Sequence, residues 1–146
     1  MKTFRCGKDK LPGDILYVVI KRLLGILVLA LMFFAASGFF TIYSQVKRVC
    51  TLAMTNFKKD CGESLILVLG SVEYNFRAKN SAVWALGQLA DKSALPTLRE
   101  LDSTLTDSRK CQSETSICKY EVEKAIRWCE KGNVTSWMYK NVKRLP

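Results

Sequence analysis

The sequence LLGILVLALMFFAASGFF, Leu23 to Phe40, runs through eighteen residues without a charged side chain or a proline. Extended to Tyr43, this stretch would be ~31 Å long as an α-helix, which is roughly the thickness of the hydrocarbon core of a bilayer. A helix also satisfies its own backbone hydrogen bonds in lipid. Residues 23–43 are therefore predicted to form a transmembrane anchor whose partner is the lipid bilayer.

Two other interpretations of the stretch stay open. A buried core helix is disfavoured because a chain of 146 residues rarely covers one helix on all sides. A cleaved signal peptide is the stronger rival, since Ala35-Ala36-Ser37 offers a cleavage site and Lys21-Arg22 a basic flank. The 22 residues before the run are long for such a flank, and apolar residues continue past the site. An uncleaved signal anchor is the preferred interpretation.

The charges around the anchor predict its orientation. The chain carries a net charge of +10, and six basic residues precede the anchor within residues 1–22. Four follow soon after it, namely Lys47, Arg48, Lys58 and Lys59. The positive-inside rule then favours a cytoplasmic N-terminus and a C-terminal domain on the outer side, which would be periplasmic, extracellular or lumenal. Because no Arg/Lys-rich run follows the anchor, nucleic acid is not favoured as a partner.

The chain after the anchor is predicted to be all α-helical, because no window alternates apolar and polar residues as a strand would. Residues 44–58 either continue the anchor or form a separate packing helix. N-caps are expected at Asp60 (in a capping box with Glu63), Asn75 and Ser93. Four more helices are expected at about 61–71, 76–90, 94–105 and 118–131.

These elements predict four segments along the chain. They are a basic N-terminal segment with a short juxtamembrane helix (1–22), the anchor (23–43), a helical domain (44–131) and a basic C-terminal tail (132–146).

The helical domain contains an internal repeat of helix pairs. Leu65 aligns with Leu98 at an offset of 33 residues, and Ala85 aligns with Ala125 at an offset of 40. Offsets of this size are typical of an α-solenoid. The segment RAKNSAVWALGQLADKSALPTLREL, Arg77 to Leu101, resembles HEAT-like repeats. The resemblance implies a short repeat domain that binds proteins on a concave face and has no chemistry of its own.

The core of these repeats is predicted to consist of apolar residues at helical spacing. They are Leu65, Val83, Trp84, Leu86, Leu89, Leu95, Leu98, Leu101, Val122, Ala125 and Ile126. The predicted fold is thus all-α, with one N-terminal transmembrane helix followed by a short HEAT-like domain.

Five of the six cysteines follow the anchor, a density typical of an oxidising compartment. Cys111 and Cys118 are close enough in sequence to form a disulfide across a loop, and Cys50 and Cys61 can do so if the chain turns between them. Cys129 and Cys6 then remain as candidate free thiols. A zinc site on Cys111, Cys118 and Cys129 is an alternative without a recognised ligand spacing.

The residue types present argue against an enzyme. The chain has no histidine, which excludes Ser-His-Asp and Cys-His catalysis and the usual zinc hydrolase sites. It has no Gly-rich phosphate loop and no C-x-x-C motif. No catalytic, cofactor-binding or metal-ligating residue is predicted.

The predicted function is that of a membrane-anchored HEAT-repeat module, an interaction scaffold for a protein partner without catalytic activity. An accessory or assembly subunit of a larger membrane complex is the alternative, because two repeats are fewer than a solenoid usually needs. A secreted or thiol-dependent protein ranks behind both.

Overall fold

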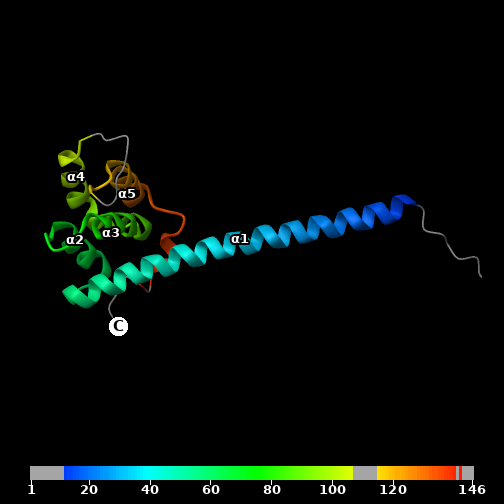
Figure 1. Cartoon of the computed structure of the whole chain (residues 1–146), viewed down its shortest axis with the longest axis horizontal. Coiled ribbons are helices and arrows are strands. Elements are labelled where there is room, and N and C mark those ends of the chain that lie inside the picture. Colours follow the sequence, from blue (N-terminus) through cyan, green and yellow to red (C-terminus); the bar gives the residue numbers. More distant parts are fainter. Residues whose placement is uncertain (1–11, 107–114, 141, 143–146) are drawn as a thin grey trace, which may run out of the picture. The chain divides into compact units, whose positions relative to one another are not determined.

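The computed structural model describes residues 12–106, 115–140 and 142, and within these residues every regular element is a helix, as predicted. The chain divides into two units, Met1–Phe40 and Thr41–Pro146. In chain order the elements are α1 (Pro12–Phe57), α2 (Cys61–Gly70), α3 (Phe76–Leu89), the 3₁₀ helix η1 (Lys92–Ala94), α4 (Leu95–Thr104), α5 (Lys119–Lys131) and the 3₁₀ helix η2 (Ser136–Tyr139) (Figure 1).

The first unit contains the apolar run as part of α1. The most apolar 18-residue window of this helix has a mean hydropathy of 2.5, and none of it is buried within the structure. Leu29 and Phe33, for example, are 67% and 70% exposed. Helix α1 is therefore long and apolar enough to cross a membrane, where lipid would cover side chains that water solvates poorly.

Helix α1 is longer at both ends than the predicted anchor. It begins at Pro12, so the short separate helix expected before the anchor is instead the first turns of α1. Proline is tolerated there because its missing N–H would have no helical acceptor in the first turn. At the other end α1 continues to Phe57, so residues 44–57 extend the apolar helix rather than form a new one.

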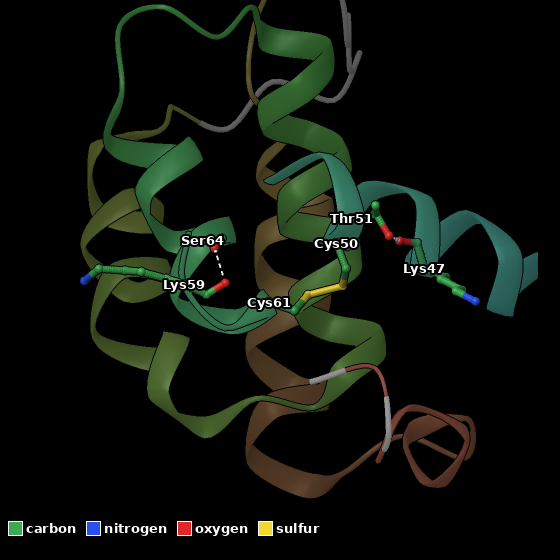
Figure 2. Close-up of a disulfide and its surroundings, with 6 residues drawn as sticks. All are labelled: Lys47, Cys50, Thr51, Lys59, Cys61 and Ser64. Atoms are coloured by element: carbon green, nitrogen blue, oxygen red, sulfur yellow. Dashed lines mark hydrogen bonds between the residues drawn. A yellow bond between two sulfur atoms is a disulfide. The ribbon is translucent and has the colours of Figure 1, made fainter. Parts of the chain in front are cut away.

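A tight turn connects α1 to α2. Lys58 adopts a left-handed conformation with φ of 54°, and α2 begins three residues later at Cys61. The capping box predicted for Asp60 and Glu63 is wrong, since the Asp60 side chain makes no capping hydrogen bond. Glu63 instead lies 3.6 Å from the ammonium of Lys59, and Ser64 Oγ donates to the Lys59 carbonyl at 2.9 Å (Figure 2).

The next two helix starts show one correct cap and one misassigned cap. Asn75 caps α3 as predicted, because its side chain accepts a hydrogen bond from Ala78 N at 2.9 Å. Ser93, which was predicted to cap the next helix, does not accept the capping hydrogen bond there. Asp91 accepts from both the backbone N–H (3.1 Å) and the hydroxyl (2.8 Å) of Ser93, and η1 forms before α4. A carboxylate two residues earlier thus outcompetes the serine hydroxyl.

The second unit packs around α3, which contacts α2 on one side and α5 on the other, while α4 packs on α5. Residues of α1 join this core through Val46, Cys50 and Ala53. Of the predicted core residues, seven are buried: Leu65, Val83, Leu86, Leu89, Leu98, Val122 and Ala125. The other four, Trp84, Leu95, Leu101 and Ile126, are partly buried and pack against the same core.

Candidate partner-binding groove

A groove of about 500 Å³ opens in the second unit between the last turns of α1 and the first turns of α3. Residues of α2 and of the α2–α3 turn also line it. The groove is lined by Gln45, Arg48, Val49, Leu52, Ala53 and Asn56 of α1, by Leu65 and Val68 of α2, and by Tyr74, Asn75, Arg77, Ala78, Ser81 and Ala82.

The base of the groove is apolar. Ala53, Leu65, Val68 and Ala82 are all buried and present hydrocarbon to it. Leu52 lies on the rim and is 59% exposed, although it belongs to the otherwise polar outer face of α1. An apolar base beside an exposed leucine favours a ligand that brings apolar side chains of its own.

The charged groups that line the groove are of one sign. Arg48 and Arg77 both contribute to it, and no Asp or Glu occurs among the described residues that line it. Both arginine side chains lie on exposed positions, one on α1 and one on α3. Arg48 therefore brings positive charge to the groove, which attracts carboxylates and repels cationic ligands.

A hydrogen bond joins two residues that line the groove, Asn56 and Tyr74. Asn56 Nδ2 donates to the hydroxyl of Tyr74 at 2.8 Å, which connects the end of α1 to the α2–α3 turn. The Tyr74 ring also packs on Phe57, with ring centroids 6.0 Å apart. These two contacts hold Tyr74 in position as a wall of the groove.

A disulfide fixes the two helices that form the base. Cys50 of α1 and Cys61 at the start of α2 are bonded, with their Cα atoms 5.0 Å apart and both side chains fully buried (Figure 2). The Cys50–Cys61 pair was predicted on the condition that the chain turns between the two cysteines, and the chain makes that turn at Lys58. A structural disulfide of this kind is typical of an oxidising compartment, so it favours such a compartment for the second unit.

Two other cysteines lie within the described residues, Cys118 and Cys129. Cys118 is also disulfide-bonded, whereas Cys111, its predicted partner, and Cys6 lie outside the described residues. Cys129 is fully buried on α5, and its thiol donates to the Leu86 carbonyl at 3.6 Å. The zinc site that used Cys118 does not fit, because a sulfur in a disulfide is not available as a thiolate ligand.

The part of the chain with described coordinates contains no cluster of three or more Cys, Asp or Glu side chains suited to a metal ion. The groove combines an apolar base with the exposed side chains of Leu52 and Arg48.

Sequence reasoning did not find this groove, because residues 44–58 were considered only as a continuation of the anchor or as a packing helix. Leu52 was the available signal, since it interrupts the polar face of that segment. No protein family model, curated protein or solved structure matches the chain, so the groove is interpreted from its own geometry.

Proposed function

We propose that this chain is a membrane-anchored, non-enzymatic interaction module whose groove binds an acidic, amphipathic segment of a partner protein. The observation that carries the proposal is the groove itself, with its apolar base, its exposed Leu52 and the exposed guanidinium of Arg48. Residues 23–43 hold the module at the bilayer.

The module lies on the outer side of the membrane in this proposal. The Cys50–Cys61 disulfide follows the apolar run, and such bonds persist in oxidising compartments. The six basic residues of 1–22 precede the run and favour the cytoplasm under the positive-inside rule. Both features agree on a cytoplasmic N-terminus.

The packing of the helices supports a HEAT-like arrangement for the module. Helices α2 and α3 form one adjacent pair, α4 and α5 form the next, and α3 packs against α5. Two repeats would leave their end faces open to water. The last turns of α1 supply Val46 and Ala53 to the core, and η2 supplies Tyr139, so both segments cover apolar surface that further repeats would otherwise cover.

An amphipathic helix is the partner chemistry that fits the groove best. Its apolar face would cover Leu52 and the groove base, as in other helix-in-groove complexes. Acidic side chains flanking that face would lie near Arg48, and a guanidinium group forms paired hydrogen bonds with a carboxylate.

A displayed library of random 16-residue peptides, panned against the full chain in lipid nanodiscs, tests this proposal. Selected peptides are expected to be enriched in Asp and Glu next to apolar residues. Their Kd should weaken at least tenfold for Arg48→Glu and for Leu52→Glu. Lys47→Glu is the matched control, because Lys47 is also exposed on α1 but does not line the groove, and it should change the Kd less than threefold.

Two outcomes would overturn the proposal. One is a set of selected peptides without acidic enrichment. The other is binding that Arg48→Glu and Leu52→Glu leave unchanged, which would place the contact surface elsewhere on the module.

A further inference from the structure

We propose that the segment Val134–Lys140 is a second membrane contact, which inserts Trp137 into the headgroup region of the bilayer that holds α1. This inference rests on the proposed anchoring of residues 23–43. Its observations are independent of the groove and concern the C-terminal part of the module.

The first observation places η2 beside Tyr43 of α1. The rings of Tyr43 and Tyr139 stack with centroids 6.0 Å apart and an angle of 7° between their planes. Tyr43 is the last residue of the proposed anchor, residues 23–43, and aromatic residues at the ends of a membrane span are favoured at the membrane–water interface. Tyr139 is fully buried, so this stack holds η2 beside Tyr43.

The second observation is that the segment is held in place by the module and is not a loose tail. Asn133 Nδ2 and Thr135 Oγ1 both donate to the side-chain oxygen of Gln88, at 3.0 and 2.7 Å. Gln88 is itself buried on α3, and η2 contacts that helix. Two side-chain hydrogen bonds therefore fix the start of the segment, and the tyrosine stack fixes its end.

The third observation is the chemistry of what this fixed segment exposes. Trp137 is 66% exposed and Val134 is 79% exposed, although both are apolar and their neighbours Thr135 and Tyr139 are buried. Lys140 is exposed beside them. Tryptophan is enriched at the membrane–water interface, and a lysine near that interface extends its ammonium group toward the headgroups.

The charge of the surrounding chain agrees with a lipid surface. Neither residues 41–57 nor residues 132–146 contain an Asp or a Glu. A headgroup region with anionic lipid is therefore not opposed by any carboxylate of these two segments. The occupant of the exposed Trp137 surface is thus the lipid interface rather than a second protein.

Tryptophan fluorescence in vesicles of phosphatidylcholine and phosphatidylglycerol, with and without bromine on the acyl chains near the headgroup, tests this inference. The full chain has three tryptophans, and Trp84 and Trp128 lie partly buried on α3 and α5. Brominated lipid is expected to quench part of the emission, and Trp137→Phe should remove most of that quenching. Lys140→Glu should reduce it in anionic vesicles only.

The double variant Trp137→Phe/Tyr120→Trp is the matched control. Tyr120 is 63% exposed near the start of α5, whereas Lys131 at the other end of that helix leads into the segment. Eleven residues of helix separate them by roughly 16 Å, so an indole at position 120 should escape the quencher.

Flotation of the same vesicles separates failure of this inference from failure of anchoring. If the chain floats with lipid after an alkaline carbonate wash but the wild type and Trp137→Phe are quenched equally, the anchor stands and the Trp137 contact is refuted. If no form of the chain floats, the anchoring of residues 23–43 is itself wrong.

Discussion

Gly87 of α3 lies directly against Ala125 of α5. A Cβ atom added to Gly87 would stand 3.0 Å from the Cα of Ala125 and 3.0 Å from Cε3 of Trp128. Contact this close is available only to residues without a side chain on one of the two helices. Helices α3 and α5 therefore meet at a point where backbone packs on backbone.

Gly87→Ala is expected to destabilise the module. Alanine gains about 1 kcal/mol over glycine in a helix interior, but overpacking a filled contact costs about 1–3 kcal/mol. Because the nearest atom is backbone, the helices must separate, so we expect a net loss of about 1 kcal/mol. Urea unfolding of the full chain in mild detergent measures it, followed by tryptophan fluorescence, since all three tryptophans lie after the anchor.

Gly70→Ala provides the control for that experiment. Gly70 is the last residue of α2, is exposed, and has nothing within 4 Å of an added Cβ. The alanine should leave the free energy of unfolding unchanged or raise it. Equal stability of the two variants would mean that α3 and α5 do not meet as closely as the structure describes.

Removal of the Cys50–Cys61 disulfide should also lower stability. The bond closes a loop of 11 residues, which corresponds to about 3 kcal/mol in the chain-entropy model. Cys50→Ala/Cys61→Ala removes both sulfurs, so no new thiol is created. The urea midpoint of the double variant should fall, and reductant should lower the midpoint of the wild type further than that of the variant. A reductant effect of the same size in both would assign the stabilisation to another bond.

How far the sequence could predict this structure is visible at particular residues. Leu65, Leu86, Leu98 and Val122 were predicted as core because helical spacing places them on one face, and burial follows such spacing directly. The cap at Asn75 was equally local, since its side chain needs only the backbone three residues on.

Two helix caps were assigned to the wrong residue. In each case a neighbouring side chain could make the same kind of contact, and residue spacing alone does not show which of them does. Asp91 and Ser93 were both able to cap the same turn, and the structure uses Asp91. Glu63 forms an ion pair with Lys59 instead of a capping box with Asp60. The groove and the Tyr43–Tyr139 stack were beyond prediction for a different reason. Each joins segments far apart in the chain, and a single sequence carries no signal for such pairs beyond an unexpected apolar residue such as Leu52 or Trp137.

Gln88→Leu is expected to destabilise the module and release the C-terminal segment. The change keeps the size of the side chain but removes the acceptor of the Asn133 and Thr135 hydrogen bonds. A buried hydroxyl left without its acceptor costs about 1–3 kcal/mol. The urea midpoint should fall, and hydrogen exchange at residues 134–139 should accelerate.

The same substitution at an exposed glutamine is the control. Gln45→Leu lies on the outer face of α1, where a change should stay within about 0.5 kcal/mol. If Gln88→Leu left the exchange of residues 134–139 unaltered, the two hydrogen bonds would not be what holds that segment.

Tyr139 is expected to make the stability of the module fall at alkaline pH. Burial raises the pKa of the Tyr139 phenol above its usual value of 10.0, and this effect exceeds the opposing contact with Thr135. A raised pKa in the folded state means that the fold favours the protonated phenol. That stabilisation is complete below pH 10 and is lost as the pH rises through the higher pKa of the folded state.

Tyr139→Phe keeps a ring of the same shape against Tyr43 but cannot ionise, so its urea midpoint should fall less than that of the wild type between pH 9 and about 11. Midpoints that decline in parallel for the two proteins would show that the Tyr139 hydroxyl is not buried in the folded chain.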